Sequence, residues 1–346
     1  MMKISPALVL LFLLQGELSF GQEAGSGPKS NPSLPGYSGF HSNIGLQEII
    51  EVGVPLSDRA KGKVPAAGKS FLDRVDAAVS KPAPPPKPKG PVTYSVQAGT
   101  RAYSTSNVLR QESSLAQSSG VIESNVGFAV SHQAFKLNEY VTMLPRLDLM
   151  MQWAWYAENS ELLDYRFGLI KGGVAFGFPE NWSIGTSLDY NTLHNLDSGD
   201  KTFDSVSPSV SLQKIIPTSE TSFFMFDSMM RWSKMDAETF FPAAGIFADS
   251  GDNYQTTLSV SYIKMLGFDQ EWTIMPRLAV NRTNYTKDPN TGRLDYLYSA
   301  GVSVIYQWNE WFGIQGFGTW NKMESDTIPN FKAFDIGIAI NGNYRF

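Results

Sequence analysis

The sequence offers few side chains for covalent catalysis, because it contains three histidines and no cysteine. Serine hydrolysis needs a histidine base beside a serine and a third group that orients the base. His194 with Asp197 is the one pair that looks suited to such chemistry, whereas His41 and His132 lie in unrelated segments. The sequence contains no G-x-S-x-G, H-E-x-x-H or phosphate-loop motif. We therefore expect polar rim residues at His194 rather than an enzyme.

The tetrapeptide Asp-Ser-Gly-Asp occurs twice, at residues 197–200 and 249–252. Carboxylates around a glycine turn can hold Ca²⁺, but this spacing differs from that of the EF-hand loop. The same residue types are also ordinary turn formers. We expect two turns, no dedicated metal site and no cofactor. Acidic loops of this kind can also meet divalent cations that bridge surface lipids.

Charge and cysteine content exclude several classes of protein. The net charge of −5 has the wrong sign for a nucleic-acid-binding protein. The absence of cysteine excludes a disulfide scaffold, a lipoprotein anchor and a thiolate metal site. No run of about 18 apolar residues follows the N-terminus, so we expect no transmembrane helix.

Most of the chain after Pro91 alternates apolar and polar residues with a period of two, which predicts β-strands. At the C-terminus, Phe334, Ile336, Ile338 and Ile340 fall on one face and small or polar residues on the other. We expect about twelve strands, at 92–103, 121–135, 139–157, 162–178, 181–194, 203–216, 220–233, 253–266, 270–285, 293–308, 310–321 and 331–346.

The connections between these segments alternate between short turns and longer loops, as in transmembrane antiparallel β-barrels. A soluble β-sandwich would share the alternation within strands. Tryptophans distinguish the two, because a membrane barrel carries aromatic girdles at both interfaces, whereas a sandwich buries its rings centrally. Successive residues of a strand alternate between its two faces, and we call this alternation parity. By parity, the tryptophans that lie on the apolar face and near strand ends are Trp153, Trp155, Trp182, Trp232, Trp272, Trp308 and Trp320. The pattern favours the membrane barrel.

The first 91 residues differ in composition from the rest. Residues 1–21 combine Lys3, an apolar run and a small-residue cleavage site, which predicts a secretory signal peptide. Residues 22–91 are rich in proline, glycine and serine and are expected to form a mostly disordered periplasmic arm. One short amphipathic helix is possible at 70–80. The barrel is then expected at 92–346.

The signal peptide, the aromatic bands and a last strand that ends in Tyr344-Arg345-Phe346 resemble those of bacterial outer-membrane β-barrel proteins. The segment NRTNYTKDPNTGRLDYLYSAGVSVIYQWNEWF is similar to porin-like barrels and points to no particular subfamily. The resemblance implies location in the outer membrane of a Gram-negative cell, in contact with its lipid. It also implies that Tyr344 and Phe346 form a signal for the barrel-assembly machinery.

Charged residues on the opposite face should line the lumen. MLPRLDL and IMPRLAV look like a local repeat, with Pro145 and Pro276 toward lipid and each expected to mark a bulge or a weakened hydrogen bond. The arginines of the repeat should face each other across the lumen. The predicted constriction comprises Arg146, Asp148, Lys171, Asp189, Asp227 and Arg277.

Two functions remain open for such a barrel. Rings of charge set selectivity in pores, which favours an outer-membrane channel that passes small polar solutes. A salt-bridged interior can instead close a narrow barrel that anchors the membrane or a periplasmic partner. Inward apolar residues favour a narrow or partly occluded lumen: Met225, Met229, Ile263, Met275 and Ile305. The sequence does not indicate an oligomeric state.

Overall fold

The computed structural model of this chain describes residues 91–110, 112–219, 221–237, 249–267, 271–309 and 311–345. The predicted signal peptide and nearly all of the predicted arm lie outside these residues. Within the described part, the chain forms twelve long strands and the two-residue strand β3 (Phe135–Lys136). The long strands are β1 (Val92–Thr105), β2 (Ser119–His132), β4 (Thr142–Tyr156), β5 (Tyr165–Phe178), β6 (Trp182–Asn195), β7 (Lys201–Ser219), β8 (Ser222–Ala237), β9 (Asn253–Leu266), β10 (Trp272–Tyr285), β11 (Leu294–Gln307), β12 (Phe312–Ser325) and β13 (Phe331–Arg345).

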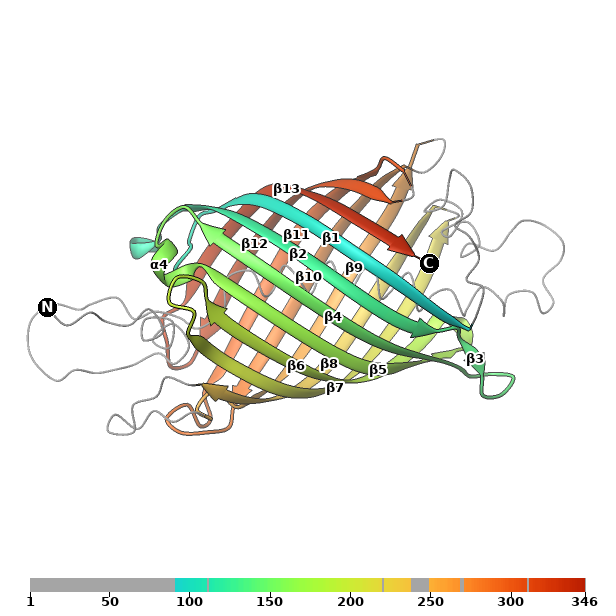
Figure 1. Ribbon diagram of the computed structural model, residues 1–346, viewed down its shortest axis with the longest axis horizontal. Helices are drawn as coiled ribbons and strands as arrows, with labels where there is room; N and C mark the ends of the chain where they lie inside the picture. The colour runs from blue at the N-terminus through green and yellow to red at the C-terminus, as the bar shows by residue number, and fades with distance from the viewer. Residues whose placement is uncertain are drawn as a thin grey trace, which may run out of the picture.

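The strands close into an antiparallel barrel. β1 pairs with β13 on one side and with β2 on the other, and β2 pairs with β4 beyond the short β3. Each long strand in the described part therefore has two neighbours, so the barrel presents no open sheet edge. Figure 1 shows the tilted strands around a common axis, with helix α4 (Ser160–Leu163) at one end and β3 at the other. The predicted all-β barrel of twelve strands is confirmed.

The outer face of the barrel is apolar, as β13 illustrates. Phe334, Ile336, Ile338 and Ile340 are each 46–61% exposed, whereas the alternate residue Ala339 is 3% exposed. The same alternation recurs along the other long strands, where large apolar side chains point away from the lumen. In a closed barrel the backbone N–H and C=O groups bond between neighbouring strands, and this exterior presents apolar side chains to lipid. The chain is therefore a transmembrane β-barrel.

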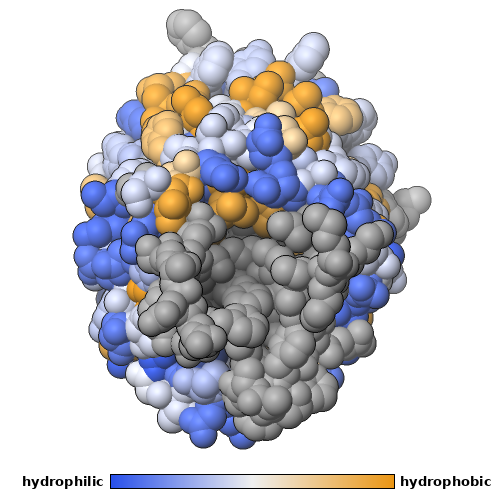
Figure 2. All heavy atoms as spheres, turned by 90° about the vertical axis from the view of Figure 1, so that its left-hand side faces the viewer, coloured by the Kyte–Doolittle hydropathy of each residue, from blue (hydrophilic) through white to orange (hydrophobic). Residues whose placement is uncertain are grey.

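The two ends of the barrel differ. At one end the connections include the 3₁₀ turn Pro179–Asn181 and the two residues between β7 and β8. Loops at the other end include residues 106–118 and 157–164, and Figure 2 shows hydrophilic residues over much of that rim. No helix among the described residues is long and apolar enough to cross a bilayer.

The local irregularities differ from those predicted. The strand register continues without a shift past Pro145 and Pro276, so of the two predicted alternatives the bulge is wrong. At Pro276 the β9–β10 pairing is interrupted, which agrees with the alternative of a weakened hydrogen bond. Shifts in register occur instead at Leu193/His194 and at Pro217/Ser219. The second predicted strand also ends earlier, at His132, before a longer connection that contains β3.

The lipid-facing position of Ile338 yields a stability prediction. Ile338 is 61% exposed at the middle of β13. Arginine there would lie in hydrocarbon, so we expect Ile338→Arg to lower the free energy of unfolding by about 2–4 kcal/mol. Reversible urea unfolding of barrels refolded into lipid vesicles measures the difference. The control is Leu266→Arg at the end of β9, where the cost should be only ~0–1 kcal/mol. Equal costs at the two sites would contradict the assigned membrane position.

Candidate solute pathway through the barrel

The six predicted constriction residues all project from inward positions of the wall, on strands β4, β5, β6, β8 and β10. Three of them form a row across neighbouring strands, because Asp148 pairs in register with Lys171, and Lys171 with Asp189. Side chains at paired positions on one face of a sheet lie close enough to interact. The row therefore alternates negative, positive and negative charge.

Arg146 binds the acid of its own strand. Its Nε donates to both carboxylate oxygens of Asp148, at 2.8 and 2.9 Å, and its Nη2 lies 2.6 Å from Asp148 Oδ1. This is a forked arginine–carboxylate pair, the strongest common geometry for such a contact. The sequence analysis expected Arg146 and Arg277 to face each other across the lumen. The structure adds that Arg146 is neutralised by Asp148 on its own strand.

Asp189 is paired with an arginine two strands away. Arg231 Nη2 lies 3.7 Å from Asp189 Oδ2, and both side chains are less than a tenth exposed. Ser187 also donates to Asp189, at 3.2 Å. Arg231 is not among the six residues predicted for the constriction. The distance to Asp189 shows that the two belong to one group.

Asp227 and Arg277 are linked through a shared serine. Gln213 Nε2 donates to Asp227 Oδ1 at 2.9 Å, and Ser259 Oγ donates to Asp227 Oδ2 at 3.3 Å. Arg277 Nη2 donates to Ser259 Oγ at 3.2 Å. We call the inward charged residues of β4–β10 the charged face: Arg146, Asp148, Lys171, Asp189, Asp227, Arg231 and Arg277. Positive and negative groups are interleaved on it, so its field is short-ranged.

The predicted girdle tryptophans lie on the outside of the barrel. Trp155, Trp182, Trp232, Trp272, Trp308 and Trp320 are exposed and Trp153 is partly exposed. Tyr344 is also exposed near the end of β13, where its ring meets that of Trp311 edge to face, with ring centroids 5.8 Å apart. Phe346 lies outside the described residues. The role of Tyr344 and Phe346 in assembly stays a prediction.

The residues considered for catalysis or metal binding have structural contacts. His194 Nε2 lies 3.1 Å from Thr192 Oγ1, and Asp197 is exposed in the loop beyond. In the second Asp-Ser-Gly-Asp turn, Lys287 Nζ lies 3.2 Å from Asp249 Oδ2 in an ion pair. Asp252 Oδ1 accepts a hydrogen bond from the backbone N–H of Met235 at 2.7 Å. Burial raises the pKa of the Asp252 carboxyl above its ordinary value. Within the described residues, no cluster of three acids or histidines could hold a metal ion.

The β1–β2 loop folds into the mouth of the barrel, which the sequence analysis did not predict. Val108 is fully buried and belongs to an apolar cluster whose other members include inward side chains of β1, β2 and β4–β8. Asn107 Nδ2 donates to the Lys332 carbonyl at 3.0 Å, and Arg110 Nη2 lies 3.6 Å from Asp335 Oδ2. The apolar pair Val108-Leu109 in a mostly polar loop was the available sequence signal.

A second feature that the sequence analysis missed is a buried carboxylate below this loop. Glu123 on β2 is 2% exposed and forms an ion pair with Arg101 on β1. It accepts hydrogen bonds from Tyr103 Oη at 2.8 Å and from Gln152 Nε2 at 3.1 Å. Gln152 also donates to Tyr165 Oη at 3.0 Å. The network ties β1, β2, β4 and β5 together inside the lumen.

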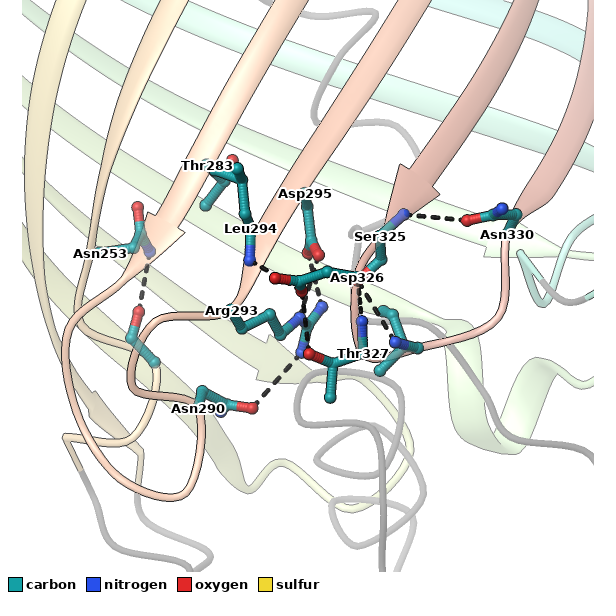
Figure 3. A network of polar contacts seen from close by, with 12 residues as sticks. Asn253, Thr283, Asn290, Arg293, Leu294, Asp295, Ser325, Asp326, Thr327 and Asn330 are labelled. Carbon is teal, nitrogen blue, oxygen red and sulfur yellow. Dashed lines mark hydrogen bonds and ion pairs between the residues drawn. The ribbon is translucent and has the colours of Figure 1, made fainter.

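Loops on the other side of the mouth are held by a separate network. Figure 3 shows Arg293 between Asn290 and Asp295, with Nη2 2.6 Å from Asp295 Oδ2. Asp326, from the β12–β13 loop, accepts from the Leu294 backbone at 3.0 Å. The β8–β9 loop joins through Ser250 Oγ, which donates to the Asp288 carbonyl at 2.8 Å. Side-chain and backbone hydrogen bonds therefore fix this part of the rim.

The interior is apolar near the short-turn end of β7–β10. Ile215, Phe223, Met225, Ile263, Met265 and Met275 form one buried cluster there. Three of them, Met225, Ile263 and Met275, were predicted to face inward. Along the barrel axis, an apolar patch at this end and an apolar cluster beneath the β1–β2 loop therefore flank the charged face.

Comparisons with known proteins give structural likeness only. The β domain of the Bordetella autotransporter BrkA is 10% identical, covering 72% of this chain and 99% of its own, with a TM-score of 0.41. An outer membrane channel from Pseudomonas putida F1 is 12% identical, covering 75% and 97%, with a TM-score of 0.48. The translocator domain of the autotransporter NalP from Neisseria meningitidis is 9% identical, covering 74% and 90%, with a TM-score of 0.38. No family model and no curated protein matches the sequence.

Proposed function

We propose that this barrel lies in the outer membrane and passes small polar solutes through a narrow lumen of mixed charge. The observation that carries the proposal is the charged face at mid-barrel. Burying ion pairs adds little or no stability compared with apolar packing, so a barrel that only had to be closed would gain little from them. A wall of fixed charges and hydrogen-bonding groups instead suits a water-filled passage.

The orientation in the membrane follows the usual asymmetry of such barrels. Short turns face the periplasm and longer loops face outward in outer-membrane barrels. This places the β1–β2 loop at the outer mouth and the segment before Val92 on the periplasmic side. The N-terminal arm is accordingly proposed to lie in the periplasm.

A closed anchoring barrel is the second candidate, and the β1–β2 loop favours it. Val108 from this loop and Leu163 from α4 are buried among inward side chains of β1, β2 and β4–β8. Such packing fills part of the outer mouth. Conductance separates the two functions, since a closed barrel passes no ions while a narrow channel gives small, steady openings.

Removing Arg146 is expected to make the channel prefer cations. Arg146→Ala deprives Asp148 of its forked partner and leaves one more uncompensated negative charge on the wall. Single-channel recording in a planar bilayer with asymmetric KCl should show a shift in reversal potential toward cations. Arg277→Ala should shift it in the same direction, because Asp227 keeps its bonds from Gln213 and Ser259.

The matched control removes both members of the forked pair. Arg146→Ala with Asp148→Ala changes the wall volume similarly but leaves its net charge as in the wild type. Its reversal potential should return close to the wild-type value. A wild-type barrel that is folded but silent would overturn the channel proposal in favour of the closed barrel.

A further inference from the structure

One sector of the lumen wall carries carboxamides in place of charges. Gln97 on β1, Asn125 on β2, Gln315 on β12 and Asn341 on β13 occupy inward positions. The strands are neighbours in the ring, and Gly99 of β1 pairs in register with both Asn125 and Asn341. We call these four residues the carboxamide face.

Glycines allow the amides to lie along the wall. A Cβ at Gly99 would be 2.7 Å from Asn341 Oδ1 and 3.3 Å from Asn125 Nδ2, so both amides reach over this position from opposite sides. Gln97 lies over Gly127 in the same way, with its Nε2 2.6 Å from where a Cβ would be. Three amide groups from three strands thus converge on a small area.

The amides retain hydrogen-bonding capacity. Among the described residues, none donates to or accepts from the side chains of Gln97, Asn125 or Asn341. All three are partly exposed, so water or a solute must satisfy them. Gln315 donates to Ser303 at 2.9 Å. Each carboxamide offers both donors and an acceptor without carrying charge.

The nearest charges and aromatic rings complete the chemistry. Arg101 and Glu123, the next inward charges on β1 and β2, neutralise each other. Further toward the loop end, Tyr103 and Phe317 meet edge to face, with ring centroids 6.0 Å apart. Tyr103 is buried, so the partly exposed Phe317 is the ring that a solute can meet. An apolar ring near uncharged donors and acceptors suits a molecule that has both C–H faces and hydroxyl groups.

We propose that the carboxamide face binds uncharged polyhydroxylated solutes of sugar size during passage. Hydroxyl groups match carboxamides because both donate and accept, whereas an ion meets no opposite charge on these uncharged side chains. On the charged face opposite, positive and negative side chains bind one another. That face is therefore polar and hydrated but does not strongly attract ions of either sign. The proposal rests on the channel function and names the class of solute.

The test uses the full-length refolded protein and a neutral trisaccharide, raffinose, as the probe. In a planar bilayer, raffinose should interrupt the ion current in a concentration-dependent way. Gln97→Ala with Asn341→Ala removes two of the free amides, so the apparent dissociation constant should rise about 5- to 30-fold. The control is Asn281→Ala, an inward amide that is already bonded to Thr257 and Thr283. It should leave raffinose binding unchanged.

The outcomes separate the two proposals. A steady wild-type current that raffinose does not interrupt would overturn the carboxamide site and leave the channel proposal intact. So would equal interruption in the double variant and in the Asn281→Ala control. A silent wild-type barrel would overturn the channel, and calorimetric titration of the detergent-refolded barrel then decides the site. Heat of raffinose binding that the double variant loses supports the site, and its absence in the wild type overturns it.

Discussion

Glu123→Leu is expected to lower the free energy of unfolding by about 3–5 kcal/mol, because it leaves the Arg101 guanidinium without its buried counter-charge. Glu123 is 2% exposed, and its two oxygens also accept from Tyr103 and Gln152. The substitution therefore removes the acceptor of three groups at once. Urea unfolding in lipid vesicles, followed by tryptophan fluorescence, measures the loss.

The double variant Arg101→Leu with Glu123→Leu is the informative control. Replacing both members of a buried ion pair by apolar groups is often neutral or stabilising. We expect it to recover most of the stability that Glu123→Leu loses. A double variant as unstable as the single one would show that the hydrogen bonds of Tyr103 and Gln152, rather than the uncompensated charge, dominate the energetics.

Opening the outer mouth should produce the largest change in conductance. Val108→Ser with Leu109→Ser puts hydroxyl groups where the β1–β2 loop packs against the apolar cluster beneath it. Burying a hydroxyl without a partner is costly, so the loop should leave the lumen. We expect single-channel conductance to rise several-fold, or a silent wild-type barrel to become conducting.

The control for this prediction lies in the same loop. Leu115→Ser with Ala116→Ser makes the same chemical change at exposed positions. Its conductance should equal that of the wild type. If both pairs of substitutions leave the conductance unchanged, the loop does not limit passage, and the narrowest part of the lumen lies deeper in the barrel.

The direction in which each strand residue points could be predicted from the sequence. The period of two is a property of the extended backbone, so parity alone placed Arg146 and Asp227 inward and Trp232 and Ile338 outward. The number of strands and the closure of the barrel could also be predicted from the sequence. Strands that each turn an apolar face to lipid must form all their backbone hydrogen bonds with one another, and a closed barrel does this. These inferences depend on local pattern only.

Which charges meet could not be predicted in this way. Arg146 binds Asp148 on its own strand, and Asp189 is paired with Arg231 two strands away. Such pairs depend on the stagger between strands and on side-chain torsions, and parity contains neither. The expected opposition of Arg146 and Arg277 used parity and height alone, and it left out the nearer partners that each arginine has on its own side.

The path of the β1–β2 loop was decided by tertiary structure alone. A loop has no repeating pattern, and Val108 is buried because it joins an apolar cluster to which seven strands contribute side chains. The carboxamide face arises in a similar way, since Asn341 joins Gln97 and Asn125 of the neighbouring strands β1 and β2 only when β13 closes on β1. By itself the sequence determined a transmembrane barrel with a polar interior, whereas closure and register decided what that interior presents to a solute.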